Sequence, residues 1–154
     1  MSLGVGEAAP AFTLPGIGPG TDAGPISLSD FSGRPVVLVF YPGDDTPVCT
    51  KQLNSYNDGL DQFEALDAQV LGISAQSIDS HQKFSGKHGF KFPLLSDPDK
   101  HVAGLYATLG PLGFPRRSVF VIDAQGTVRY AHRAIAGLTY RPVAELVEVL
   151  QGLS

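Results

Sequence analysis

The sequence predicts an α/β fold in which a central mixed β-sheet is flanked by helices. Residues 36–41 form an unbroken apolar run between two prolines, the pattern of a strand buried on both faces. Segments of strand length then alternate with segments whose apolar residues recur at helical spacing, which favours helices on both faces of one sheet. The turn sequence Asp123-Ala124-Gln125-Gly126 joins two further strands as a hairpin, so antiparallel pairing is expected as well.

Composition places the chain among globular proteins. Its 154 residues suit one domain, which we expect to span residues 1–154, and its 43% hydrophobic content excludes disorder. The net charge of −4 gives no basic surface for nucleic acid, and no apolar run approaches the ~18 residues that a membrane span needs. The N-terminal residues lack the features of a signal peptide, so we expect a cytoplasmic location.

The remaining strands are predicted from apolar segments that turn residues bound. Residues 69–75 and 118–122 suit buried strands. In residues 127–134 apolar and polar side chains alternate, so this hairpin partner is expected to be half exposed. Two short segments, 11–14 and 26–28, are expected to pair with each other as an N-terminal β extension.

Four helices are predicted. The first begins near Pro47 and carries apolar residues on one face as far as Phe63. Gly59 lies inside this pattern, so we expect the helix to kink or to end early there. The others are expected at residues 78–88, 100–108 and 143–150.

The segment after the buried strand contains the residues with the clearest chemistry. Thr46 suits the N-cap of the first helix and Pro47 its first position, which makes Cys49 the third helical residue. The Thr46 hydroxyl is then expected to accept from a helix amide and to touch Cys49. The helix dipole and the free amides of this first turn favour a thiolate, which we expect to face solvent. A buried, inert cysteine is the alternative interpretation.

Cys49 is the only cysteine of the chain, which constrains the chemistry further. It excludes an internal disulfide and a zinc site built from several cysteines. The histidines are spread without the spacing of metal ligands, so no metal is expected. Asp44 and Asp45, just before the cap, are interpreted as solvated turn residues.

The motif Tyr41-Pro42-x-x-x-Thr46-Pro47-x-Cys49-Thr50-x-Gln52 resembles the active-site signature of peroxiredoxins of the bacterioferritin-comigratory-protein or PrxQ group. Residues 6–15, 27–33 and 115–123 are similar to further blocks of that group, so the resemblance covers nearly the whole chain. It implies a thioredoxin-like fold and a thiol peroxidase, without a cofactor, that reduces hydrogen peroxide and organic hydroperoxides in antioxidant defence.

The resemblance also implies roles for individual residues. Cys49 would be the peroxidatic cysteine, Thr46 would hold the thiolate and the peroxide through its hydroxyl, and Pro42 would shield the site from water. The catalytic arginine of the family would be Arg117, with Arg116 as its competitor. Because neighbours along a strand point to opposite faces, only one of these two arginines is expected to face Cys49.

One departure from the family pattern concerns recycling. Many relatives carry a resolving cysteine five residues on, where this chain has Asn54, which we interpret as a polar residue of the helix surface. The chain therefore looks like a 1-Cys variant. Its sulfenic acid would be reduced by an external thiol such as thioredoxin, glutaredoxin or a low-molecular-weight thiol, or two chains would join through their Cys49 residues. A redox-sensing module, in which Cys49 oxidation regulates an interaction, is the alternative.

The loop before Arg117 carries two apolar residues whose role the sequence leaves open. Leu112 and Phe114 suit a wall of the peroxide pocket, a dimer contact or a cap on the core. The expected assembly is accordingly a monomer or a homodimer.

Overall fold

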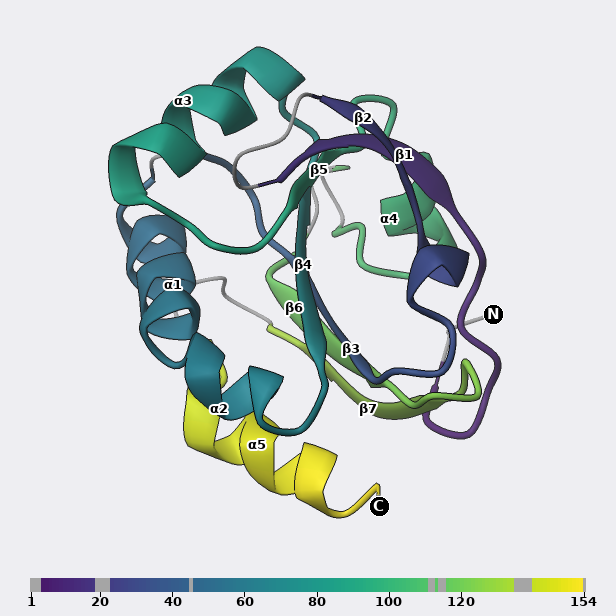
Figure 1. Ribbon diagram of the computed structural model, residues 1–154. Coiled ribbons are helices and arrows are strands. Elements are labelled where there is room, and N and C mark those ends of the chain that lie inside the picture. Colours follow the sequence, from purple (N-terminus) through teal and green to yellow (C-terminus); the bar gives the residue numbers. More distant parts are fainter. Residues whose placement is uncertain are drawn as a thin grey trace.

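The computed structural model describes residues 4–18, 23–44, 46–110, 113, 116–134 and 140–153. In this part of the chain seven strands form one sheet in the order β2-β1-β5-β4-β3-β6-β7 (Figure 1). The strands are β1 Thr13–Ile17, β2 Gly24–Ser27, β3 Val36–Phe40, β4 Gln69–Ser74, β5 Leu94–Ser96, β6 Ser118–Ile122 and β7 Val128–Arg133. The pairs β3–β4 and β4–β5 are parallel and the other pairs are antiparallel, so the sheet is mixed, as predicted.

Helices cover both faces of this sheet. They are α1 Pro47–Asp58, α2 Leu60–Glu64, α3 Ile78–His88, α4 His101–Leu105 and α5 Val143–Gln151, with a short 3₁₀ helix, η1, at Leu28–Phe31. Helices α1, α2, α3 and α5 lie on one face of the sheet and α4 on the other (Figure 1). Side chains of the first four pack into one core and those of α4 into a second, with η1 against the latter. None of the helices in the described residues is long and apolar enough to cross a membrane.

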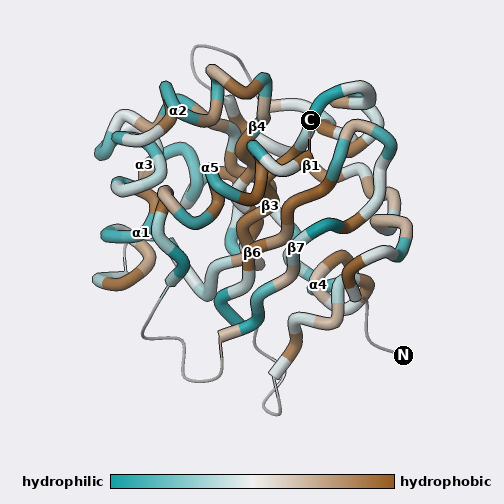
Figure 2. The backbone as a smooth tube through the Cα atoms, turned by 90° about the horizontal axis from the view of Figure 1, so that it is seen from below, coloured by the Kyte–Doolittle hydropathy of each residue, from teal (hydrophilic) through white to brown (hydrophobic). Residues whose placement is uncertain are grey.

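β3 forms the centre of both cores, as its unbroken apolar run predicts. Val37 and Val39 point to the face of α1, whereas Val36, Leu38 and Phe40 point to the face of α4. Figure 2 shows the apolar strands at the middle of the molecule with more polar segments around them. A strand that is buried on both faces needs no alternation of polar and apolar residues.

Four elements differ from the sequence-based prediction. β2 spans Gly24–Ser27 and not residues 26–28, since Leu28 begins η1. β1 begins at Thr13, later than residue 11, and β5 was not predicted, because three residues are too few for a periodic pattern. The helix predicted at residues 100–108 is the shorter α4. Lys100 and Ala107 adopt left-handed φ values of 61° and 56°, which end regular helix on either side.

The topology brings several distant segments to one edge of the sheet. β3, β4 and β5 run parallel, so the residues that follow them lie at the same edge. β6 runs antiparallel to β3, and its first residue, Ser118, pairs with Phe40, the last residue of β3. The chain before β6 therefore meets the chain after β3. This carboxyl edge of the sheet is where ligands bind in open α/β folds.

Gly59 ends α1, in agreement with the early end that the sequence predicts, and the structure gives the reason for a glycine there. A Cβ at this position would lie 2.8 Å and 3.0 Å from the two γ-methyl groups of Val143, the first residue of α5. The φ of Gly59 is −91°, which any residue adopts. The close approach of α5, and not backbone strain, therefore excludes a side chain.

We expect Gly59→Ala to lower the free energy of unfolding by about 1–3 kcal/mol, because the stiff, β-branched Val143 must be displaced. Gly86→Ala is the matched control: Gly86 is exposed within α3 and has no atom within 4 Å of the added Cβ. This control should raise the free energy of unfolding by up to about 1 kcal/mol through helix propensity. Urea unfolding measures both values, and an equal stabilisation by the two variants would contradict the explanation.

Candidate active site

Cys49 lies in the first turn of α1 at the carboxyl edge of the sheet. Thr46 is the N-cap of α1 and Pro47 its first residue, as the sequence predicts. The expectation that the thiol faces solvent is wrong, since the exposed fraction of Cys49 is 0%. The reason is helical spacing: Cys49, Leu53 and Tyr56 lie on one face of α1 and pack into the same core. The thiol is therefore buried at the inner side of the helix N-terminus.

Arg117 brings a positive charge to this buried sulfur. Its Nη2 donates to Cys49 Sγ at 3.2 Å and its Nη1 donates to Gln52 Oε1 at 2.6 Å, and only 3% of the residue is exposed. Arg116 turns elsewhere, and its Nε donates to the carbonyl oxygen of Ala134 at 3.3 Å. The two neighbours face opposite ways, as residues next to a strand do. The structure thus places one guanidinium, that of Arg117, on the thiol.

A chain of hydrogen bonds holds Arg117 in this orientation. The Tyr56 hydroxyl donates to the carbonyl oxygen of Arg141 at 2.7 Å and accepts from Gln52 Nε2 at 3.2 Å. A carbonyl oxygen can only accept, so these bonds run in one direction and leave Gln52 Oε1 facing the guanidinium. Burial raises the pKa of Tyr56 to about 12, which keeps the hydroxyl proton in place. Gln52 and Tyr56 are thus positioning residues for Arg117.

Thr46 caps α1 in position but not through its side chain. Its hydroxyl donates to the carbonyl oxygen of Gly43 at 3.1 Å and accepts from no helix amide, so the predicted bond to the first turn is absent. Threonine hydroxyls often bond to nearby backbone groups in this way. Pro42 lies at the start of the same loop with an exposed ring.

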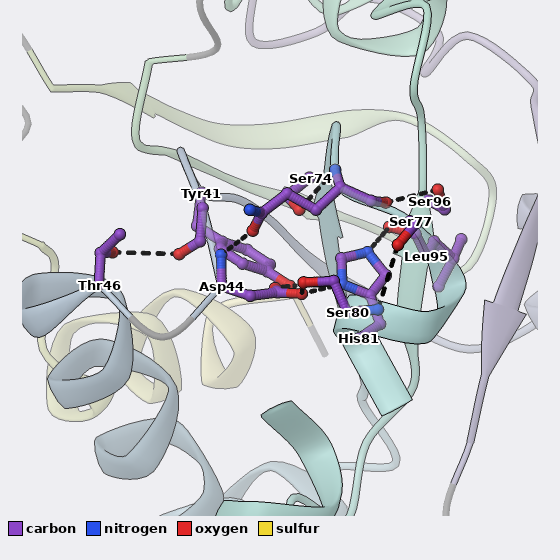
Figure 3. A network of polar contacts seen from close by, with 11 residues as sticks. Tyr41, Asp44, Thr46, Ser74, Ser77, Ser80, His81, Leu95 and Ser96 are labelled. Carbon is purple, nitrogen blue, oxygen red and sulfur yellow. Dashed lines mark hydrogen bonds and ion pairs between the residues drawn. The ribbon is translucent and has the colours of Figure 1, made fainter. Parts of the chain in front are cut away.

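Asp44 is not the solvated turn residue that the sequence suggested. Its side chain is 3% exposed and is surrounded by donors (Figure 3). The Tyr41 hydroxyl donates to Oδ1 and the Ser80 hydroxyl to Oδ2, each at 2.7 Å. His81 Nδ1 lies 2.7 Å from Oδ2.

His81 completes this network from α3. It has no exposed surface, and its Nε2 donates to the carbonyl oxygen of Leu95 at 2.8 Å. Burial alone would raise the pKa of Asp44, but the hydrogen bond and charge of His81, with the Tyr41 and Ser80 hydroxyls, lower it below the usual value. Burial and the Asp44 charge raise the pKa of Tyr41 well above the usual value.

Of the remaining candidate residues, the structure describes only Asn54. Asn54 is partly buried on α1. Asp45, Leu112 and Phe114 lie outside the described residues. The described part of the chain contains no cluster of three or more histidine, cysteine or acidic residues that could hold a metal ion.

Sequence reasoning missed the buried hydrogen bonds of Gln52, Tyr56 and His81. Gln52 follows Cys49 by three residues and therefore shares its helix face, a signal that was available. His81 and Phe84 lie three residues apart on the buried face of α3, and no local pattern of the sequence could name the partner of this histidine.

Comparisons with known proteins show the family to which the chain belongs. The pattern of the AhpC/TSA family matches residues 5–131. Peroxiredoxin Q, chloroplastic, of Oryza sativa subsp. japonica is 38% identical over 158 residues, covering 96% of this chain and 67% of the relative. The putative peroxiredoxin bcp of Coxiella burnetii is 40% identical over 136 residues, covering 83% of this chain and 87% of the relative.

Solved structures show the same relationship. The reduced 2-Cys peroxiredoxin of Plasmodium vivax superposes with a TM-score of 0.87 at 28% identity, covering 96% of this chain and 94% of that one. Mycobacterium tuberculosis AhpC does so with a TM-score of 0.88 at 27% identity, covering 99% and 94%. The predicted thioredoxin-like α/β fold is thereby confirmed. The chain belongs to the AhpC/TSA family and is a peroxiredoxin, a thiol peroxidase with a single cysteine.

Proposed function

We propose that Cys49 is the nucleophile that reduces the peroxide and that Arg117 is its electrostatic partner. The observation that carries this proposal is the contact of 3.2 Å between Arg117 Nη2 and the buried Cys49 Sγ. Arginine keeps its charge throughout the accessible pH range and offers a planar fork of donors. One arm of the fork is bound to Gln52, so the other is held in a constant direction toward the sulfur.

The strength of this attraction supports a buried thiolate. At 3.2 Å and an effective dielectric constant of about 20, a thiolate and a guanidinium attract each other by roughly 5 kcal/mol. This is comparable to the several kcal/mol that burial of one such charge costs. The N-terminus of α1 adds a further favourable field.

The reaction that follows is a two-electron oxidation of sulfur. The Cys49 thiolate attacks the terminal oxygen of the hydroperoxide, an S–O bond forms and the O–O bond breaks. Sulfenic acid remains on Cys49, and the departing oxygen leaves as an alkoxide, or hydroxide for hydrogen peroxide, which takes up a proton. Negative charge thus moves from sulfur to oxygen, and the Arg117 guanidinium lies beside this path.

Thr46 and Pro42 are proposed to act on the peroxide side of the sulfur. The Thr46 hydroxyl already donates its proton to the Gly43 carbonyl, so its oxygen is left as an acceptor for the O–H of a hydroperoxide. The resemblance had implied that the Thr46 hydroxyl also holds the thiolate, for which it would have to donate its proton to the sulfur. Pro42, at the exposed start of the loop, is proposed to keep water from the reacting atoms.

Recycling of the sulfenic acid is proposed to require an external thiol. The chain has no second cysteine, so one thiol displaces water to form a mixed disulfide with Cys49 and a second thiol releases the Cys49 thiol. Thioredoxin, glutaredoxin and low-molecular-weight thiols all fit this chemistry.

Three further expectations stay predictions. They are the single domain, the assembly as a monomer or homodimer, and the cytoplasmic location. The curated relatives include a bacterial protein and chloroplastic plant proteins.

Cys49→Ser should abolish the reaction with peroxide. Stopped-flow mixing of the wild-type chain with hydrogen peroxide should show rapid loss of one thiol per chain, and intact-mass analysis should show the gain of one oxygen atom. Because the chain has one cysteine, the modified atom is unambiguous. A wild-type thiol that reacts no faster than free cysteine would contradict the proposed nucleophile.

Arg117→Ala should lower the second-order rate constant with hydrogen peroxide by roughly 10²–10³, the usual effect of losing one fixed donor at a developing charge. Arg117→Lys should recover only part of this rate, because a lysine cannot donate to Gln52 and Cys49 as a planar fork. Arg116→Ala is the matched control and should change the rate little, since its guanidinium is bound to the Ala134 carbonyl. Equal losses for Arg116→Ala and Arg117→Ala would refute the assignment.

Peroxide consumption should continue over many turnovers when an external thiol is supplied. The assay compares thioredoxin with its reductase, glutaredoxin with glutathione, and low-molecular-weight thiols alone. Intact-mass analysis during turnover should detect the mixed disulfide of Cys49 with the effective thiol. A stable oxidised form that resists all three would oppose recycling and favour the redox-sensing interpretation.

A further inference from the structure

The network of Asp44 and His81 takes no part in the chemistry proposed above, although it lies on the loop before the nucleophile. Asp44 belongs to this loop, whereas His81 belongs to α3, 37 residues further along. Their side chains are 3% and 0% exposed. Buried ion pairs add little to stability because desolvation offsets their attraction. Their presence beside a reactive site points to a positional role.

The hydrogen bonds define where the protons lie. His81 Nε2 faces the Leu95 carbonyl oxygen, which can only accept, so this nitrogen carries a proton. Nδ1 faces Asp44 Oδ2, and the same carboxylate also accepts from Tyr41 and Ser80. A carboxylate with three donors around it is best satisfied when ionised, so the shared proton belongs to His81. The pair is an imidazolium and a carboxylate.

Asp44 also fixes the orientation of the Gly43 carbonyl group, which the Thr46 hydroxyl contacts. The Gly43 carbonyl and the Asp44 amide belong to one planar peptide unit, so they turn together. The Asp44 amide donates to Gln76 Oε1, and the Asp44 side chain is held by His81. At the opposite edge of this peptide unit, the Gly43 carbonyl accepts from the Thr46 hydroxyl. Anchoring Asp44 therefore sets the direction of the Thr46 hydroxyl.

We propose that Asp44 and His81 form a buried ion pair that positions Thr46 for the peroxide. The pair touches neither the sulfur nor the proposed site of the substrate, and it acts through the Gly43–Asp44 peptide and the Thr46 hydroxyl. The inference rests on the proposed function, in which the Thr46 oxygen accepts from the hydroperoxide. It assigns a function to a network whose members come from the end of β3, the loop and α3 (Figure 3).

A double-mutant cycle on the rate constant with hydrogen peroxide tests this inference. Asp44→Asn keeps the shape of the side chain and removes its charge, and should slow the reaction 10- to 100-fold, as misplacement of a positioning group does. Thr46→Val removes the hydroxyl. In the Thr46→Val background, Asp44→Asn should cost less than about threefold, because the group through which it acts is gone. Asp79→Asn is the control: it makes the same charge change on the exposed face of α3 and should leave the rate unchanged.

The outcomes separate the inference from the proposed function. Independent, multiplying effects of Asp44→Asn and Thr46→Val would overturn the inference, because they would show a general structural role. The inference would also be overturned if Thr46→Val lowered the rate constant with hydrogen peroxide and Asp44→Asn left it unchanged. The proposed function of Cys49 would then remain intact. A rate constant that Thr46→Val leaves unchanged would overturn both the inference and the proposed role of Thr46.

A milder variant guards against loss of folding. Ser80→Ala removes one of the three donors to Asp44 and leaves His81 in place. It should show a smaller rate loss of the same kind, again absent in the Thr46→Val background. Thermal unfolding of each variant checks that the measured rate belongs to folded protein. A Ser80→Ala loss that persists without the Thr46 hydroxyl would overturn the inference.

Discussion

The contact between the Arg117 guanidinium and the Cys49 sulfur is the constraint on which the site depends. Both groups are buried, so each needs the other as a partner. Their meeting requires β6 to lie beside β3 in the antiparallel sense, because only then does the residue before Ser118 reach the start of α1. It also requires α1 to begin directly after the loop that follows β3. The order of the strands in the sheet therefore decides whether Arg117 can contact Cys49.

Two hydrogen-bond chains surround this contact, and each ends on a backbone carbonyl. On one side, Arg117 is held through Gln52 and Tyr56 to the Arg141 carbonyl. On the other side, Asp44 is held through His81 to the Leu95 carbonyl. Because a carbonyl can only accept, the Arg141 carbonyl sets the direction of the bonds of Tyr56 and Gln52, and the Leu95 carbonyl fixes a proton on His81 Nε2. Backbone carbonyl groups thus anchor the buried polar side chains of the site.

The sequence predicts those features that depend on neighbours in the chain. The run of β3 and the amphipathic α5 are local patterns, as is the position of Cys49 three residues after its cap. β5 has no pattern of its own and exists through its pairing with β1 and β4. The pair of Asp44 and His81 joins residues 37 positions apart through the sheet topology, so a single sequence contains no local signal for it. The burial of Cys49 likewise depends on what α1 packs against.

The end of β3 and the start of β6 meet only in the folded sheet, so the surroundings of the Cys49 sulfur depend on complete folding. The arginine that faces Cys49 is 68 residues away in sequence and reaches it only when β6 has joined the sheet. A nascent or misfolded chain therefore exposes an ordinary thiol, without a guanidinium partner or an ordered helix N-terminus beside it. Under the proposed role of Cys49, such a chain escapes rapid oxidation by peroxide until its tertiary structure is in place. The speed of that oxidation is, for the same reason, a direct gauge of native protein in a mixed preparation.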